Sequence, residues 1–424
     1  MKGFDFPPPD LLKLMAETKS YDVIIAGGGF VGMSLALALG GAAPKGLRVA
    51  LVDAEPPEST KPDARASSLS AASKGLLSVL GVWPELAQGA EAIANIEITD
   101  SSLDARRRPH LLCFDDDLKP GESGAYMIEN EDLIRALKSA VLREPAIEML
   151  APDSVTGFEA TPFSIQAELA SGGRLGAKLL IAADGKRSRL REQASIKCVG
   201  WSYPQLGIVT TVGHTKPHHG KAVQHFLPGG PFAMLPLKGN RTSIVWTEDK
   251  TTGEAIMTAG EAAFLAELAK RFGTRLGDIT LAGPRQSFPL DFQVARSFVG
   301  ERLALVGDAA HAVHPLAGQG LNIGLRDVAA LTEIVVEGAR LGMDVGASAL
   351  LERYERWRRF DSAFSATVMD GLNSLFSNDN APLRVLRDLG LGIVDNAPWL
   401  KRALVREAAG VSGTVPRLLK GQRL

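Results

Sequence analysis

A glycine-rich turn near the start of the chain has the spacing of a dinucleotide-binding site. The run G-G-G-F-V-G places Gly27, Gly29 and Gly32 in the pattern GxGxxG, and the acid Asp53 follows at the expected distance of roughly 20 residues. Such glycines let the backbone approach a pyrophosphate, and an acid at the end of the second strand suits a ribose hydroxyl. The alternative is a turn used only for helix-to-sheet packing. FAD and NAD both use this pattern, so the turn alone does not choose between them.

The elements predicted around this turn form a βαβ unit. We expect a strand over Asp22–Ala26, a helix over Phe30–Leu39 and a second strand over Arg48–Asp53. The run Val23–Pro44 carries no charge and is long enough to cross a bilayer. Its clustered glycines between a strand pattern and a helix pattern favour the dinucleotide turn over a transmembrane span.

Two further strand ends carry acids that could reach the same ligand. A buried-strand pattern over Leu179–Ala183 ends in Asp184 and Gly185, and another over Arg302–Val306 is followed by Asp308. A glycine loop then opens a long helix, whose apolar stripe comprises Leu321, Leu325, Val328 and Val335. The exposed start of that helix attracts negative charge, such as the charge that gathers on a reduced flavin ring. A purely structural glycine loop is the alternative.

Composition excludes several classes of function. Lys and Arg number 47 against 48 Asp and Glu, so no basic field favours a nucleic-acid partner. The chain has no HExxH motif, no paired CxxC and no two-His-one-carboxylate spacing, which predicts no metal site. Cys113 and Cys198 are isolated, which favours a reducing, cytoplasmic compartment. The first twenty residues lack the apolar region of a secretory signal.

The histidines are not predicted to be catalytic. His218 and His219 lie in a polar P-H-H-G-K turn, which predicts that both are solvated. His311 and His314 follow the third acidic strand end, where we favour a structural hydrogen bond over acid–base work.

With these motifs in this order, the chain resembles the flavoprotein aromatic hydroxylases of the para-hydroxybenzoate hydroxylase class. Within that class it is most similar to the ubiquinone-biosynthesis hydroxylases that act on polyprenylated phenols. The likeness runs from Tyr21 to the tail and includes Arg65 with L-G-V-W, A-D-G, and G-D-A-A-H with H-P-L-A-G-Q-G-L-N-I-G-L-R-D. The subgroup is favoured by the run from Gln224 to Leu237, by Gln319 beside Asn322, and by the tail G-V-S-G-T-V-P-R-L-L-K-G.

The resemblance implies roles for most of these residues. The glycine turn and Asp53 would hold the AMP half of FAD, and Arg65, by itself more typical of a solvated charge, would reach the phosphates. Asp184 and Gly185 would contact FAD and a transient NAD(P)H, and Asp308 would bind the ribityl chain. The remaining cofactor candidates lie at the isoalloxazine loop: Pro315, Gly318, Gln319, Gly320, Leu321 and Asn322.

One position departs from the family pattern. The family often has Arg in a V-E-N-R stretch, whereas Tyr126–Leu133 reads Y-M-I-E-N-E-D-L and has Glu131 in that place. This departure leaves the contact of the candidate Asn130 open.

The chemistry implied by the resemblance is ring hydroxylation by a flavin hydroperoxide. FAD would be the cofactor, molecular oxygen the cosubstrate, and NAD(P)H or a protein donor the reductant. No second GxGxxG follows a strand later in the chain, so a nicotinamide would bind only transiently. Three alternatives stay open: a hydroxylase of another aromatic or lipid, an FAD-linked prenyl reductase, and a catalytically silent assembly subunit.

A lipophilic phenol requires a mostly apolar cavity above the flavin. Strand-like runs within Trp201–Trp246 suit a sheet that covers such a cavity. The candidates for its lining are Phe226, Met234, Leu235 and Pro236, with plain core packing as the alternative for each.

The architecture expected is α/β, with a discontinuous doubly wound FAD domain, an inserted mixed β-sheet substrate domain and a helical C-terminal region. We assign 1–75, 125–200 and 283–345 to the first, 76–124 and 201–282 to the second, and 346–424 to the third. The basic tail, with Trp399, Leu400, Leu404 and Val405, would suit contact with an anionic membrane surface; a solvated C-terminus is the alternative. A biosynthetic complex peripheral to the inner membrane is a further expectation, and the oligomeric state is left open.

Overall fold

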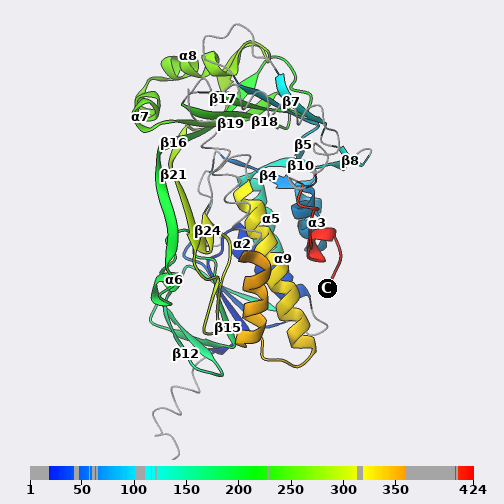
Figure 1. Ribbon diagram of the computed structural model, residues 1–424, viewed down its shortest axis with the longest axis vertical. Coiled ribbons are helices and arrows are strands. Elements are labelled where there is room, and N and C mark those ends of the chain that lie inside the picture. Colours follow the sequence, from blue (N-terminus) through cyan, green and yellow to red (C-terminus); the bar gives the residue numbers. More distant parts are fainter. Residues whose placement is uncertain are drawn as a thin grey trace, which may run out of the picture.

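The structure is a computed structural model of the 424-residue chain. It describes residues 19–42, 47–56, 58–59, 63, 65–100, 110–115, 117–119, 122–227, 229–312, 319–359, 406 and 409–424. Two large sheets form its framework, one above the other in the view of Figure 1.

The lower sheet has six strands and forms the centre of the main core. Its order is β11 (Ile147–Leu150), β3 (Val49–Val52), β2 (Val23–Ala26), β15 (Leu179–Ala182), β23 (Leu303–Leu305) and β22 (Val299–Gly300). β22 pairs antiparallel with β23, and the other neighbouring pairs are parallel. Four of these strands read VIIA, VALV, LLIA and LAL and are buried throughout, as expected where both faces of a parallel sheet are covered.

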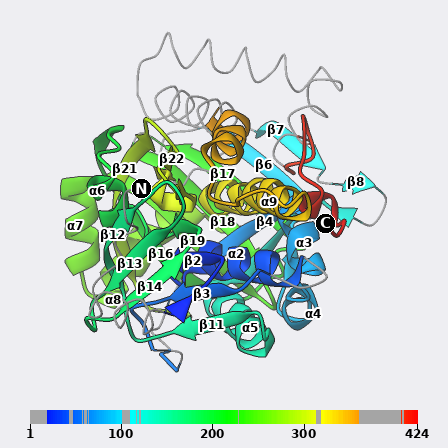
Figure 2. The same cartoon turned by 90° about the horizontal axis from the view of Figure 1, so that it is seen from below.

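Helices and a smaller sheet cover the two faces of this parallel sheet. α2 (Phe30–Gly41) contacts β2 and β3, α5 (Asn130–Arg143) contacts β11, and α9 (Gln319–Arg340) packs against α2. Figure 2 shows these helices beside the sheet strands. On the other face, β13 contacts β15 and β14 contacts β2. That smaller sheet has the order β1 (Lys19–Ser20), β14 (Arg174–Ala177), β13 (Ile165–Leu169) and β12 (Val155–Ala160).

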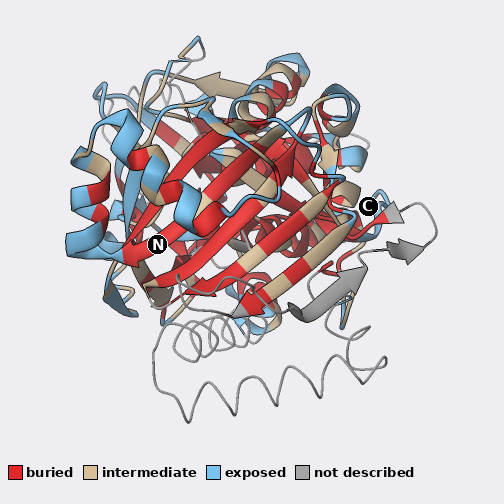
Figure 3. Ribbon diagram, turned by 90° about the horizontal axis from the view of Figure 1, so that it is seen from above, coloured by how far each residue is buried: buried red, intermediate tan, exposed pale blue. Residues whose placement is uncertain are grey.

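The upper sheet is mainly antiparallel. Its path is β24 (His311–Ala312), β21 (Gln286–Ala295), β16 (Cys198–His214), β19 (Arg241–Asp249), β18 (Gly230–Leu237), β17 (Lys221–Leu227), β6 (Asn95–Asp100) and β7 (His110–Asp115), with β20 (Ile279–Leu281) on β16. α7 (Lys250–Thr258) and α8 (Glu261–Phe272) cover its outer face and enclose an apolar core around Phe232 and Trp246. Figure 3 shows these strands largely buried and the helices exposed on their outer sides. β16 and β21 are long and run along one side of the molecule towards the parallel sheet (Figure 1).

The remaining elements are short. A three-stranded sheet has the order β4 (Ala66–Ser70), β10 (Ala125–Glu129) and β5 (Glu91–Ala92), and β8 (Asp117–Lys119) pairs with β9 (Glu122–Ser123). The shorter helices are α3 (Ala71–Val79), α4 (Trp83–Leu86), α6 (Arg189–Gln193), η1 (Gly307–Ala309) and η3 (Leu418–Lys420).

The structure confirms the predicted α/β fold class, and the predicted βαβ unit is present as β2, α2 and β3. The helix stripe is confirmed, because Leu325, Val328 and Val335 are buried in the core and Leu321 packs against it. The prediction that His218 is solvated is wrong. Its imidazole is buried and contacts Leu237 O, Gly239 O and Gly220 N, so it stabilises the β18–β19 turn.

The C-terminal region is described in two parts. A helix is described over 348–359, and 409–424 packs against α3 and α9. Trp399, Leu400, Leu404 and Val405 lie outside the described residues. No helix in the described ranges is both long and apolar enough to span a membrane. The division of the chain into three domains stays a prediction.

Candidate functional site

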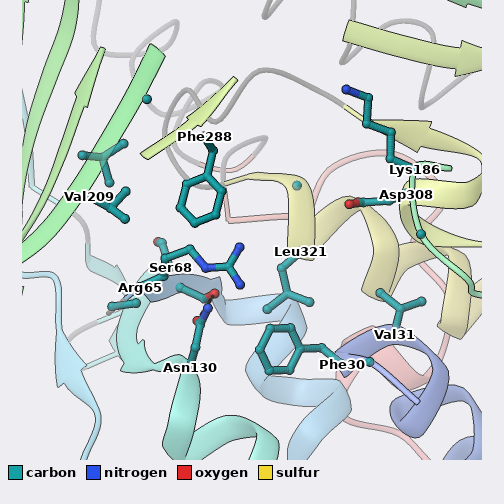
Figure 4. Close-up of a pocket in the computed structure, with 18 of the residues that line it drawn as sticks. Phe30, Val31, Arg65, Ser68, Asn130, Lys186, Val209, Phe288, Asp308 and Leu321 are labelled. Atoms are coloured by element: carbon teal, nitrogen blue, oxygen red, sulfur yellow. Dashed lines mark hydrogen bonds between the residues drawn. The ribbon is translucent and has the colours of Figure 1, made fainter. Parts of the chain in front are cut away.

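A cavity of about 590 Å³ lies between the ends of the parallel strands and the inner face of the upper sheet (Figure 4). Its lower part is lined by Gly29, Phe30, Val31, Gly32, Arg65, Ala66, Ser67, Ser68, Asn130, Ala183, Gly185, Lys186, Val306, Asp308, Ala312, Gly320 and Leu321. Its upper part is lined by Gly207, Val209, Ala233, Leu235, Ser243, Val245, Phe288, Pro289, Leu290 and Asp291. The two parts form one continuous space, with a volume in the range of small-molecule and cofactor sites.

The glycine turn follows the end of β2 and is tightly packed. A Cβ on Gly32 would lie 1.9 Å from Gly27 O, and a Cβ on Gly28 would lie 2.5 Å from Asp53 Oδ2. Gly27 has a φ of +111°, which favours glycine. Gly29 precedes α2, and a Cβ there would meet nothing within 4 Å. The start of α2 therefore offers free N–H groups and open space, as phosphate binding requires.

The end of β15 brings a second predicted pair to the cavity. Ala183 and Gly185 line it, and Gly185 has a φ of +82°. Asp184 lies between them, and its buried Oδ1 has no hydrogen-bond partner among the described residues. Burial raises the pKa of Asp184, against the lowering effect of a hydrogen bond from Ser188. Asp184 itself is not among the residues that line the cavity.

The end of β23 places Asp308 on the cavity wall. Its carboxylate borders the cavity. Desolvation by the surrounding protein nevertheless raises the pKa of Asp308, and this effect exceeds the lowering by the charges of His311, Arg65 and Lys186. Gly29, Gly185 and Asp308 belong to different strand ends and line the same cavity, because parallel strands end at the same edge of their sheet.

A buried carboxylate holds the turn that carries Asp308. Asp327, on α9, accepts hydrogen bonds from Gly307 N (2.9 Å), His311 Nε2 (2.6 Å) and Arg358 Nε (2.7 Å). Burial alone would raise the pKa of Asp327, but His311 and Arg358 lower it below its usual range. His311 therefore makes the predicted structural hydrogen bond.

Arg65 lies between the two parts of the cavity (Figure 4). Its guanidinium donates to Asp63 at 2.8 and 2.7 Å and lies 5.1 Å from the ring centre of Phe288. Asn130 Nδ2 also donates to Asp63, and Asn130 Oδ1 accepts from Ser67 Oγ at 2.7 Å. Burial alone would raise the pKa of Asp63, but the hydrogen bonds from Arg65 and Asn130 lower it. Arg65 is thus a cation at the cavity rather than a fully solvated charge.

The predicted isoalloxazine loop is described only in part. Gly320 and Leu321 line the cavity. The Asn322 side chain instead accepts from Ser70 N and Ser73 Oγ and donates to Ser68 O, so it joins α9 to β4 and α3. Pro315, Gly318 and the Gln319 side chain lie outside the described residues.

Of the four predicted substrate-lining residues, Leu235 lines the cavity. Met234 packs into the core under α7 and α8, because neighbouring residues of β18 point to opposite faces. Phe226 and Pro236 are buried, and neither is among the described residues that line the cavity. The prediction is therefore corrected for Phe226, Met234 and Pro236.

Several lining residues were not predicted. Phe30 and Val31 follow the glycine turn directly, and Lys186 follows Gly185, so adjacency to a motif was their signal. Phe288 and Asp291 lie on β21, whose sequence contains no recognisable motif. No sequence signal therefore identified them as lining residues. Lys186 Nζ forms an ion pair with Asp291, which connects the β15 turn to β21 at the cavity.

The site fits an FAD-type dinucleotide on three observations. The α2 N-terminus is open at Gly29, Asp184 has an orphaned buried oxygen, and the cavity extends beyond the turn to an apolar wall. In the described part of the chain, no group of three His, Cys, Asp or Glu residues could hold a metal ion.

Comparison with known proteins gives the same assignment. The family model described as FAD binding domain matches residues 20–367. Ubiquinone hydroxylase UbiL of Rhodospirillum rubrum is 42% identical over 409 residues, covering 95% of this chain and 93% of that protein. The 3-demethoxyubiquinol 3-hydroxylase of Escherichia coli is 36% identical, covering 92% and 98%. The mitochondrial ubiquinone biosynthesis monooxygenase COQ6 of Danio rerio is 32% identical, covering 93% and 90%.

A solved structure supports the fold. The p-nitrophenol 4-monooxygenase PnpA of Pseudomonas putida superposes with a TM-score of 0.76 at 19% identity, covering 93% of this chain and 99% of that one. At that identity the likeness concerns the fold alone.

Proposed function

The chain belongs to the FAD-binding domain family, and from that premise we propose that it is an FAD-dependent monooxygenase that hydroxylates the ring of a (poly)prenylated phenol in ubiquinone biosynthesis. One observation carries the proposal: a single cavity joins the dinucleotide turn at Gly29 to an apolar sheet face at Val209 and Leu235. A cofactor and a lipophilic ring can therefore lie in contact there.

Bound FAD would supply the oxygen-activating redox chemistry, with NAD(P)H or a protein as electron donor. The α2 N-terminus and Arg65 would hold the pyrophosphate, and Asp53 and Asp184 would bind hydroxyl groups of the nucleotide. Asp308 would bind the ribityl chain. N–H groups at Gly320 and Leu321 would stabilise negative charge on the ring system, because they lie at the start of α9.

The upper part of the cavity would position the substrate. Val209, Leu235, Val245 and Leu290 present an apolar surface suited to an aromatic ring and the first part of its tail. Lys186 and Asp291 neutralise each other at the wall, so neither presents an uncompensated charge to the ring.

Isotope labelling tests the reaction. We expect the FAD-loaded protein, supplied with NADH or NADPH and 2-farnesylphenol under ¹⁸O₂, to form a product that contains one ¹⁸O atom. If no nicotinamide reduces the flavin, a reconstituted ferredoxin and its reductase serve as donor. A product heavier by two hydrogens would instead identify a prenyl reductase. A flavin that neither donor reduces would identify a silent assembly subunit.

A deletion strain tests the biological role. We expect it to accumulate a quinone precursor that lacks one ring oxygen, measured by mass spectrometry of the lipid extract. A normal quinone pool in a strain without a second enzyme of this family would contradict the role.

We also propose a cytoplasmic protein peripheral to the inner membrane, in contact with other biosynthetic proteins. The support is the lipophilic substrate and the basic tail with its apolar residues around Trp399. Sedimentation with anionic phosphatidylglycerol vesicles, compared with neutral phosphatidylcholine vesicles, tests the membrane contact. Equal recovery in the supernatant of both would contradict it.

A further inference from the structure

We propose that the hydroxyl of Ser243 hydrogen-bonds the oxygen substituent on the substrate ring and thereby determines which rings the cavity accepts. The inference rests on the proposed function and deepens it, because it assigns a recognition contact to a neutral phenol oxygen.

The position of Ser243 follows from strand alternation. On β19, Ile244 and Trp246 pack into the core under α7 and α8, so Ser243 and Val245 project from the opposite face into the cavity. Ser243 lies between its cross-strand neighbours Leu235 and Thr211 and is only 1% exposed.

The Ser243 hydroxyl has no hydrogen bond with any described residue, although it is buried. Two other buried hydroxyls of this sheet are paired: Thr242 Oγ1 lies 3.0 Å from His214 Nε2, and Thr210 Oγ1 donates to Gly283 O at 3.3 Å. The Ser243 hydroxyl borders the cavity, so its hydrogen-bond partner comes from what occupies the cavity. Since Ser243 lines the cavity, a ligand oxygen there would satisfy it.

The surroundings of Ser243 select a neutral oxygen rather than an anionic one. Its neighbours in the wall, Val209, Leu235 and Val245, carry no polar side-chain atom. The cations at the cavity have partners already, since Arg65 binds Asp63 and Lys186 binds Asp291. A carboxylate next to Ser243 would lack the compensating charge that burial requires, whereas a phenol or methoxy oxygen requires one hydrogen-bond donor.

A ligand comparison tests the contact. The FAD-loaded wild type and the Ser243→Ala variant are titrated with 2-farnesylphenol and with farnesylbenzene, which lacks the oxygen, and Kd is read from the flavin absorbance change. We expect the wild type to prefer the phenol, and Ser243→Ala to reduce that preference by roughly 2- to 10-fold, the value of one neutral hydrogen bond. Affinity for farnesylbenzene should stay unchanged.

Two further variants control the experiment. Ser287→Ala removes a hydroxyl at an exposed position on β21, which is separated from β19 by β16, and should keep the wild-type preference. Ser243→Thr keeps a hydroxyl and should retain the preference. This variant keeps the proposal testable if the alanine variant fails to fold.

The outcomes separate this inference from the proposed function. An unchanged preference in Ser243→Ala, with ¹⁸O still incorporated by the wild type, would overturn the contact and leave the function standing. A Ser243-dependent preference without any hydroxylated product would support the contact and overturn the function. Failure of the wild type to bind either ligand would overturn both.

Discussion

Two glycines of the nucleotide turn differ in what a side chain would meet. A Cβ on Gly32 would collide with Gly27 O, whereas a Cβ on Gly29 would enter open space at the cavity. Packing therefore requires the first glycine, whereas the second leaves open space that a ligand could approach. Motif matching treats both alike, but the two requirements have different experimental signatures.

We expect Gly32→Ala to destabilise the apoprotein by about 1–3 kcal/mol or more, because a methyl group would be forced against backbone. Gly29→Ala should leave stability within about 0.5 kcal/mol, since its φ of −72° suits alanine. Gly29→Ala should nevertheless weaken FAD binding, because its methyl group would project into the cavity. Urea unfolding of the apoprotein and fluorescence titration with FAD measure both effects; equal FAD affinity in Gly29→Ala and wild type would contradict the predicted approach of the cofactor.

The raised pKa of Asp184 has a consequence for stability. A carboxyl group whose pKa is higher in the folded than in the unfolded protein makes folding less favourable as pH rises from the unfolded value of 3.8 through the folded pKa. Asp184→Asn should therefore stabilise the apoprotein at pH 7 and have little effect near pH 3, where the carboxyl is protonated in both states. Urea midpoints at the two pH values check this. A gain of the same size at both would show that ionisation is not its cause.

Among the elements, the helix at 348–359 supports the turn that carries Asp308. Tyr354 Oη donates to Leu305 O at 2.8 Å, and Glu355 Oε1 accepts from Phe298 N at 2.9 Å. Arg358 completes the support through buried Asp327, which in turn accepts from Gly307 N. The helix at 348–359, which is distant in sequence, thus holds the end of β23. The motif around Asp308 by itself does not indicate this contact.

We expect Arg358→Met to cost about 3–5 kcal/mol, because it leaves the Asp327 carboxylate buried with one partner fewer. It should also weaken FAD binding by loosening the Gly307–Asp308 turn. Arg359→Met, at the exposed neighbouring position, should cost no more than about 0.5 kcal/mol. Urea unfolding and FAD titration of both variants measure this. Similar losses in the two variants would show that the buried contact is not the cause.

At the scale of the whole molecule, the segment 409–424 packs back against the main core around the parallel sheet. Leu418 and Leu419 are buried against it, and Leu419 O approaches Gly75 of α3. Arg417 contacts Glu333 and Glu337 on α9 at 3.2 and 2.9 Å. The C-terminus lies beside α3 in Figure 1. This part of the basic tail therefore binds the protein itself.

We expect Leu419→Ser to release the segment 409–424 without unfolding the core, because the burial of a leucine side chain contributes about 1.5–3 kcal/mol at this contact. Hydrogen exchange should rise in 409–424 and in α3, while the parallel sheet stays protected. Lys420→Ser, at an exposed position, serves as the control and should leave exchange unchanged. Exchange that rises equally throughout the chain would instead indicate loss of global stability.

Much of the fold and part of the candidate site could be predicted from the sequence. The parallel strands are short, fully apolar runs between turns, and the local pattern identifies them without knowledge of their partners. Gly29, Gly185 and Asp308 each lie three residues after the end of a parallel strand, so their place at one sheet edge followed from topology. Asn322 belongs to the glycine-loop motif at the start of α9, yet its side chain joins α9 to β4. This contact connects residues more than two hundred positions apart.

What the sequence determined alone is therefore the fold class and the strand ends that line the lower cavity, because strand–turn–helix geometry is local. The upper wall was decided by tertiary structure. Met234 and Leu235 are adjacent and both apolar, and a strand sends them to opposite faces. Which face borders the cavity depends on where α7 and α8 pack, and no local pattern contains that information. The same reason separates Ser243, which faces the cavity, from Thr242, which is paired with His214 on the other side.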